Sequence, residues 1–91
     1  MTISYYVVSH KLYYFDKWKK VYDDFESIRQ KYGVKEQLLI QASDDPNHVL
    51  VVGQGDLDAI QKFVSSEELK KGMGDAGVSS EPKLFVGDEV G

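Results

Sequence analysis

Residues 3–12 carry apolar and aromatic side chains at both sets of alternating positions. β-Branched and aromatic residues favour strands, in which successive side chains point to opposite faces. One face would carry Ile3, Tyr5 and Val7, and the other Tyr6, Val8, His10 and Leu12. Because both sets are largely apolar, the pattern predicts a strand that is covered on both faces.

From Phe15 onward the apolar positions recur at steps of three and four residues, which is the spacing of an amphipathic helix. Charged residues fall between these positions, and Gly33 follows the last of them, as is typical of a helix that ends in a left-handed conformation. We predict one helix over 15–32. Its apolar stripe is Phe15, Trp18, Val21, Tyr22, Phe25, Ile28 and Tyr32.

The second half of the chain alternates in the same way between strand and helix patterns. Residues 35–42 and 48–54 favour strands, and Asp45-Pro46-Asn47-His48 between them has the composition of a type I turn. Asp56 is suited to cap a helix with apolar positions Leu57, Ile60, Phe63 and Val64.

The last part of the chain is predicted to form a short helix and a strand. Ser65 and Glu68 have the spacing of a capping box for a helix that bears Leu69 and Met73. Glycines at 72, 74 and 77 are expected to weaken this helix. After Pro82 the run KLFVG favours a final strand.

The order strand, helix, strand, strand, helix, strand predicts an α+β, ferredoxin-like βαββαβ fold, as a single domain over residues 1–91. The helices would cover one face of a four-stranded antiparallel sheet. The other face is also apolar along the first strand, and a second sheet from a symmetric partner would bury it. We therefore predict a homodimer.

Composition argues against several classes of partner. With 15 acidic and 11 basic residues the net charge is -4, which gives no positive field for nucleic acid or an anionic membrane surface. The chain has no cysteine, which excludes thiolate chemistry and cysteine-based metal sites. It also lacks an apolar run long enough for a membrane span, so we expect a soluble, cytoplasmic protein.

Several local strings, taken in order, resemble one known family. They are HK at 10–11, FDKWKKVYDDF at 15–25, YGV at 32–34, DDPNHVLVV at 44–52, SSEELKKGMGDAGV at 65–78, and Pro82. Together they resemble the antibiotic biosynthesis monooxygenase-like proteins, in particular a short stand-alone branch of mostly uncharacterised bacterial members. The resemblance implies a dimeric α+β barrel with a ligand pocket between the sheet and helices of each subunit.

The family's activities include cofactor-free oxygenation of polycyclic phenols, haem degradation and polyketide cyclisation. Its haem-degrading members use an Asn, Trp and His set that this chain does not reproduce, since Trp18 is on the first helix and the second helix has no histidine. We therefore expect neither a cofactor nor a metal.

His10 and Trp18 are the first candidate site residues. An imidazole at the end of the first strand could act as a general base on a phenol or acidic C–H. The alternative for His10 is a structural hydrogen bond to a neighbour. Trp18 lies in the helix stripe and could be a core residue, the wall of a pocket for a flat ligand, or both. The two residues could line one cavity if His10 faces the helices.

Other polar residues have weaker claims to a site. Tyr6, Tyr22 and Tyr32 could orient a carbonyl or phenol, although buried tyrosines often only satisfy their own hydroxyl. Arg29 could neutralise a ligand carboxylate, but a solvated position on the helix flank is expected. We expect His48, which follows the turn, to be exposed. We interpret Asp44 and Asp45 as residues of the turn rather than as metal ligands.

Three functions remain open from the sequence. The protein could be a cofactor-independent oxygenase or cyclase acting on a small aromatic or polyketide-like compound, with His10 as base and Trp18, Tyr6 and Tyr22 binding the ligand. It could instead be a non-catalytic, small-molecule-binding or stress-associated homodimer. The third alternative is a structural module whose helix–sheet layer is filled by its own side chains. The residues leave open whether it is an enzyme.

Overall fold

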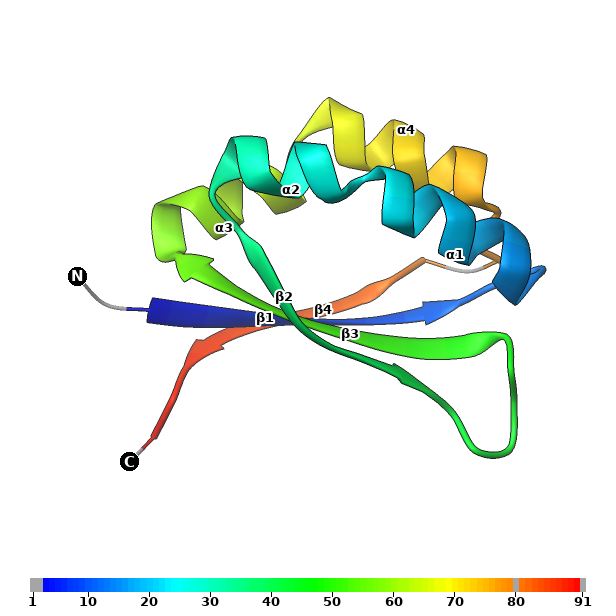
Figure 1. The fold of residues 1–91 in the computed structure, drawn as a ribbon. Coiled ribbons are helices and arrows are strands. Elements are labelled where there is room, and N and C mark those ends of the chain that lie inside the picture. The colour runs from blue at the N-terminus through cyan, green and yellow to red at the C-terminus, as the bar shows by residue number, and fades with distance from the viewer. Residues whose placement is uncertain (1–2, 80, 91) are drawn as a thin grey trace.

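The computed structural model describes residues 3–79 and 81–90, which form a layer of helices on one sheet (Figure 1). The strands and helices follow one another along the chain in the predicted order. In the described residues the elements are β1 (Ile3–Lys11), α1 (Phe15–Asp24), α2 (Glu26–Tyr32), β2 (Lys35–Gln41), β3 (His48–Asp56), α3 (Leu57–Val64), α4 (Glu67–Ala76) and β4 (Lys83–Asp88).

The strands form a four-stranded antiparallel sheet in the order β2-β3-β1-β4. The long strands β1 and β3 lie at the centre, where Tyr6 pairs with Gly53, Val8 with Val51 and His10 with Val49. These are the β1 and β3 side chains that face the helices, since Tyr6, His10, Val49 and Val51 are all buried. The ferredoxin-like fold, with helices on one face of the sheet, is confirmed.

The predicted turn between β2 and β3 is present and also anchors α1. Asp45 accepts a hydrogen bond from the backbone N–H of Asn47 through Oδ1 (2.9 Å) and one from the N–H of His48 through its carbonyl (3.1 Å). The Asn47 side chain in turn accepts from the N–H of Phe15 (2.9 Å), the first residue of α1. The hairpin therefore fixes the start of the helix that carries Trp18.

The helix predicted over 15–32 is divided at Phe25, whose backbone angles are φ -79° and ψ -3°. Its N–H is shared between the carbonyls of Val21 (3.0 Å) and Tyr22 (3.2 Å). The division lets α1 pack against α4 while α2 packs against α3, as Figure 1 shows. Gly33 ends α2 with φ 78°, as predicted.

Two predicted helix caps are wrong in detail. Asp56 precedes α3, but its side chain makes no capping hydrogen bond. Ser66 rather than Ser65 caps α4, because Ser66 Oγ accepts from the N–H of Leu69 (3.1 Å). Glu68 does not complete a capping box and instead accepts from Tyr32 Oη (2.9 Å) on α2. Only for Glu68 does a partner from a distant helix replace the predicted local bond.

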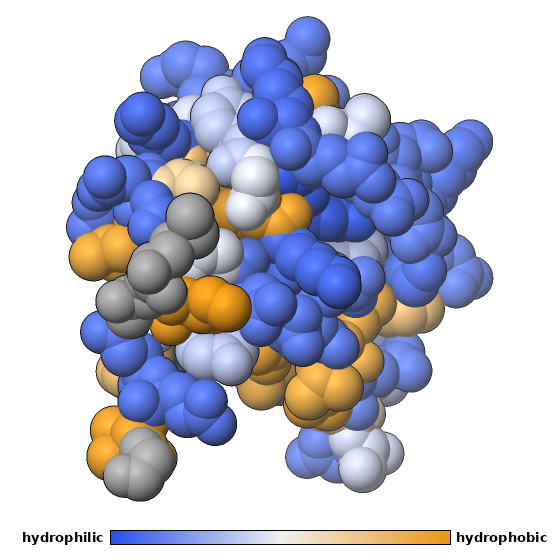
Figure 2. All heavy atoms as spheres, turned by 60° about the vertical axis from the view of Figure 1, so that its left-hand side comes forward, coloured by the Kyte–Doolittle hydropathy of each residue, from blue (hydrophilic) through white to orange (hydrophobic). Residues whose placement is uncertain are grey.

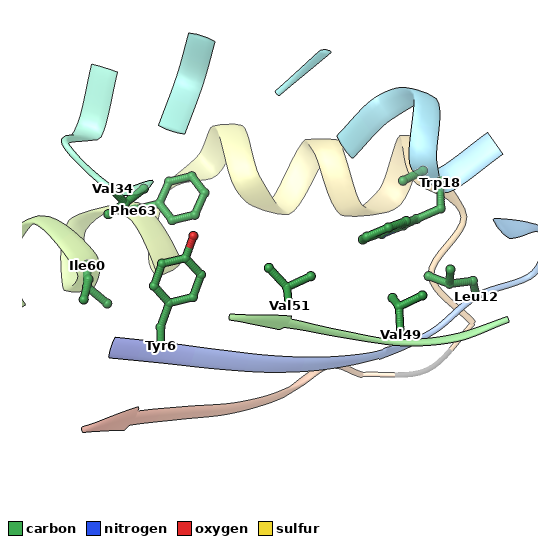
Figure 3. Close-up of a cluster of buried hydrophobic side chains, with 9 residues drawn as sticks. Tyr6, Leu12, Trp18, Val34, Val49, Val51, Ile60 and Phe63 are labelled. Carbon is green, nitrogen blue, oxygen red and sulfur yellow. The ribbon is translucent and has the colours of Figure 1, made fainter. Parts of the chain in front are cut away.

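The core lies between the helices and the sheet, as the alternating and helical patterns predict. Ile60 of α3 is fully buried, and Trp18 is only 3% exposed. Figure 3 shows Tyr6 and Phe63 at one end of this layer and Trp18 at the other, with Val51 on the sheet between them. The buried apolar cluster is Tyr6, Leu12, Trp18, Val34, Val49, Val51, Ile60, Phe63 and Ala76.

The opposite face of the sheet carries exposed apolar side chains from both edge strands. Leu38 and Ile40 of β2 are 57% and 46% exposed, and Phe85 of β4 is 70% exposed. Apolar residues accordingly gather in the lower part of Figure 2, on the side away from the helices. Among the described residues, no helix is long and apolar enough to cross a membrane.

Candidate functional site

A cavity of about 230 Å³ lies within the helix–sheet layer. It is larger than the roughly 150 Å³ cavity that accommodates benzene, but smaller than the roughly 300–1,000 Å³ pockets typical of drug-sized ligands. Glu81 and Leu84, both exposed, lie on its wall at the start of β4, so that end faces solvent. The layer is therefore not filled by its own side chains. The principal lining residues are Tyr6, Val8, His10, Trp18, Val21, Tyr22, Phe25, Arg29, Val51, Phe63, Leu69 and Met73.

His10 faces the helices and lines this cavity, although it is only 7% exposed. Its Nδ1 is buried and has no hydrogen-bond partner among the described residues, so the structural hydrogen bond considered as its alternative role is not seen at this atom. Burial lowers the pKa of His10 from 6.5 to about 4. Near neutral pH the imidazole is therefore uncharged and able to accept a proton.

Trp18 combines the two roles considered for it, because it belongs to the core and also to the cavity wall. Its ring centroid lies 5.8 Å from that of His10 and 4.8 Å from that of Tyr22, on which it stacks with an interplanar angle of 21°. Strand β1 thus supplies the imidazole and helix α1 supplies the flat aromatic surface beside it. The two residues do line one cavity.

Tyr6 reaches the cavity because its cross-strand partner is a glycine. A Cβ at Gly53 would overlap the Tyr6 ring, so this glycine leaves the space in which the ring lies. The ring centroid of Tyr6 is 6.0 Å from that of Phe63, which lies beside it in Figure 3 and also lines the cavity. Burial raises the pKa of the Tyr6 hydroxyl, which stays protonated and can donate a hydrogen bond.

Tyr22 and Arg29 form a second polar pair on the wall. The Tyr22 hydroxyl is buried, and no hydrogen bond of regular geometry is found for it in the described ranges. Its pKa is raised first by burial and then by hydrogen bonding to the nearby Glu36 carboxylate, which is close enough to act on the hydroxyl without forming a well-aligned bond. Arg29 stacks on the Tyr22 ring, with Cζ 4.2 Å from the ring centroid, and donates from Nη1 to the Tyr22 carbonyl (2.9 Å).

The predicted solvated position of Arg29 is wrong, because this residue is only 7% exposed. Arg29 follows Phe25 by four residues and precedes Tyr32 by three, so the helical period itself places it on the apolar stripe. The solvated position was predicted because Arg29 is charged, and its helical spacing was not taken into account. Stacking on Tyr22 and the bond to the Tyr22 carbonyl allow the guanidinium to remain inside.

The other predicted candidates lie away from the cavity wall. The hydroxyl of Tyr32 is bonded to Glu68, and Asp45 serves the turn. His48 is half-buried rather than exposed, and its Nε2 lies 2.9 Å from Ser9 Oγ. Within the described ranges, no group of three or more His, Cys, Asp or Glu side chains is placed to hold a metal ion.

Comparison with known proteins finds likeness in structure only, since neither a family model nor a curated protein matches the sequence. A candidate antibiotic biosynthesis monooxygenase from Bordetella bronchiseptica has a TM-score of 0.81 at 10% identity, with 99% of each chain covered. One from Caulobacter crescentus CB15 has a TM-score of 0.77 at 15% identity, covering 99% of this chain and 92% of that one.

SnoaB, a cofactor-independent oxygenase from Streptomyces nogalater, has a TM-score of 0.75 at 15% identity, covering 99% of this chain and 97% of SnoaB. At these identities the likeness establishes the fold. The chain therefore has the ferredoxin-like fold of the antibiotic biosynthesis monooxygenase-like proteins, as the local strings predict.

Proposed function

We propose that the protein is a cofactor-independent oxygenase or cyclase that acts on a small aromatic compound in the cavity beside His10. One observation carries this proposal: the uncharged imidazole of His10 lines an aromatic cavity that the surrounding side chains do not fill, and its buried Nδ1 has no hydrogen-bond partner in the described residues. The fold shared with SnoaB, an oxygenase that needs no cofactor, supports it.

In the proposed reaction His10 takes a proton from a phenol or an acidic C–H of the ligand. The resulting electron-rich anion either closes a ring or donates electrons to O₂. In the oxygenase case a CH₂ group becomes C=O, with one oxygen atom retained and the other released as water. The substrate supplies all the electrons, so no external reductant is needed.

The low pKa of His10 does not by itself prevent this proton transfer. Protonation is unfavourable in the empty cavity because the charged imidazolium loses its hydration. When the proton comes from the ligand, the imidazolium forms beside the ligand anion, and their attraction in a dry site offsets part of that cost. Trp18 and Tyr22 would hold the aromatic ring against the imidazole.

The size of the cavity narrows the substrate class. A volume of about 230 Å³ holds a single substituted ring, or two small fused rings, more readily than an extended polycyclic polyketide. We therefore propose a substrate with one or two rings.

The test is to incubate the protein with small hydroxyaromatic compounds while O₂ uptake is recorded and products are identified by mass spectrometry. We expect turnover by the native protein, loss of turnover in His10→Gln, and little change in His48→Gln, which alters a histidine outside the cavity. If His10→Gln turns over a genuine substrate at the rate of the native protein, His10 is not the base.

A second candidate function is a non-catalytic, small-molecule-binding or stress-associated homodimer. Burial lowers the pKa of His10 to about 4, which makes the imidazole a weak base, and this observation favours binding without reaction. This function predicts ligand affinity that survives His10→Gln, with no product formed. Trp18 is the only tryptophan in the chain, so its fluorescence reports ligand binding directly.

We also propose that two copies pair through the open face of the sheet. Leu38, Ile40 and Phe85 are exposed there, and an apolar face of this kind marks an interaction surface. Packing of two such faces would complete the barrel implied by the family resemblance. Light scattering during size-exclusion chromatography measures the mass and tests the pairing. A cytoplasmic location stays a prediction.

A further inference from the structure

Arg29 is a buried cation without an acidic partner. The ion pairs found in the described residues use Lys19, Lys31 and Lys70, and none of them uses Arg29. A guanidinium remains charged at all physiological pH values, and removing it from water is costly unless its charge and donors are matched. The position of Arg29 on the cavity wall is therefore unusual for a purely structural residue.

Arg29 has guanidinium donors that no hydrogen bond of the described residues uses, and these donors are open to solvent or to a ligand. A guanidinium has five N–H donors, and the hydrogen bond found for Arg29 is the one from Nη1 to the Tyr22 carbonyl. The neighbouring Tyr22 hydroxyl is also buried without a partner in the described part of the chain. A cation and a neutral hydroxyl donor thus lie together on one wall, and an anionic oxygen could satisfy both.

His10 and the Arg29 guanidinium lie at the two ends of a row of aromatic rings on the cavity wall. His10 lies 5.8 Å from Trp18, Trp18 lies 4.8 Å from Tyr22, and the Arg29 guanidinium lies 4.2 Å from Tyr22, all between ring centroids or from Cζ to the centroid. A ligand in the cavity would contact this row of rings with its anionic end toward the guanidinium. The wall is polar at its ends and apolar between them.

We propose that Arg29 and the Tyr22 hydroxyl form an anion subsite, and that the ligand of this cavity is a small aromatic carboxylate whose acid group lies there, away from His10. The proposal rests on the proposed function only in treating the cavity as a ligand site; it requires no reaction. Arg29 would determine specificity, because it separates aromatic acids from neutral aromatics of equal size.

Glu36 is the acidic residue that would compete with such a ligand. It raises the pKa of Tyr22 by hydrogen bonding as well as by its charge, and that of Tyr6 by its charge, but it is exposed and forms no ion pair with Arg29 in the described residues. Because its carboxylate is exposed, it is free to turn toward water when a ligand anion binds at the Tyr22 hydroxyl. Replacing Glu36 with Gln should strengthen binding of an anionic ligand slightly, because it removes a nearby negative charge.

The test compares benzoate with benzamide, which has nearly the same shape but no charge, by calorimetry and Trp18 fluorescence. The native protein should bind benzoate roughly tenfold or more tightly than benzamide, the factor expected for a charge-assisted hydrogen bond. In Arg29→Met the preference should disappear while benzamide affinity is retained. Tyr22→Phe should reduce the preference, and His10→Gln should leave it intact.

Equal affinity of the native protein for the two probes, or a preference that persists in Arg29→Met, would overturn the subsite. Binding of neither probe would overturn both the subsite and the cavity as a site for single-ring ligands. If Arg29→Met does not fold, Arg29→Lys is used instead, because it keeps the charge. The benzoate preference of the native protein and its reduction in Tyr22→Phe then still test the anion subsite. A benzoate preference without turnover of any aromatic compound would refute the oxygenase or cyclase and leave the subsite standing.

Discussion

The two faces of the sheet are both apolar, yet they differ in what covers them. On β1, Tyr6 and His10 face the helices and are buried, whereas Ile3 on the opposite face is 52% exposed. On β4, Phe85 points to the open face and is 70% exposed. Apolar character alone therefore does not reveal which face contains the core.

The covered face also differs from the open face in chemistry. Within the described residues it includes two buried polar atoms without a protein hydrogen-bond partner, Nδ1 of His10 and the Tyr22 hydroxyl, around a cavity. Buried polar atoms in folded proteins are nearly always hydrogen-bonded, so these two atoms are open to water or to a ligand. The open face instead presents aliphatic and aromatic side chains, as expected for contact with another protein surface.

The largest expected difference between the faces concerns stability. Ile60→Ala removes a fully buried side chain from the covered face and should lower the free energy of unfolding by about 2–5 kcal/mol. Ile40→Ala on the open face, where the side chain is 46% exposed, should cost less than about 1 kcal/mol in the monomer. Denaturant titration at low protein concentration measures both, and equal losses would contradict the distinction.

The next effect depends on pH and arises from His10. Its pKa is about 4 in the folded protein, against an ordinary value of 6.5, so between these values the unfolded chain binds a proton that the folded chain does not. Stability is therefore full above pH 6.5 and falls as the pH is lowered toward 4, by up to about 3 kcal/mol.

His10→Gln serves as the reference in that titration, because the variant retains every other titrating group. The difference in unfolding free energy between native protein and His10→Gln should shift in favour of the variant as the pH falls through this window. A constant difference would show that His10 is not desolvated.

A smaller effect on stability is expected at Gly53, where the packing of the covered face leaves no room for a Cβ atom. Gly53→Ala would force the Tyr6 ring out of its place and should cost about 1–3 kcal/mol and weaken ligand binding. Gly74→Ala on α4 is the matched control, because a Cβ there meets nothing within 4 Å; it should stabilise the protein by up to about 1 kcal/mol. Thermal unfolding of both variants measures these changes in stability. A Gly53→Ala protein as stable as the native protein would contradict the tight contact between position 53 and the Tyr6 ring.

The smallest expected effect on the monomer comes from the open face. Phe85→Ser exchanges a 70% exposed ring for a small polar group and should alter monomer stability by no more than about 0.5 kcal/mol. The same change should convert a dimer into a monomer by light scattering if the open faces pair. An unchanged dimer in Phe85→Ser would place the interface elsewhere.

Much of the fold could be predicted from sequence because it depends on local patterns. Alternation in β1, the stripe of α1 and α2, the turn at Asp45 and the helix end at Gly33 are each encoded within a few residues. The division at Phe25 and the use of Ser66 rather than Ser65 as a cap were not predicted: α1 packs against α4 and α2 against α3, and the Ser65 hydroxyl bonds back to the end of α3.

The candidate site shows the same limit. Sequence reasoning selected His10, Trp18, Tyr6 and Tyr22, and the structure brings all of them to one cavity, but their roles remain proposals. It considered Arg29 for a ligand carboxylate but expected a solvated position, because a charged residue on an apolar stripe was interpreted by its charge rather than by its position. It also assigned the glycines of α4 only a cost, whereas a Cβ at Gly72 would come within 2.6 Å of the Phe25 ring.

The sequence by itself determined the order of the elements and the apolar stripe of each helix, because these follow from periodicity within a single segment. Only the tertiary structure decided that the space between His10, Trp18, Tyr22 and Arg29 stays open and that Arg29 is buried within it. Whether a layer is filled depends on how side chains from several separate elements fit together, and no local pattern contains that information.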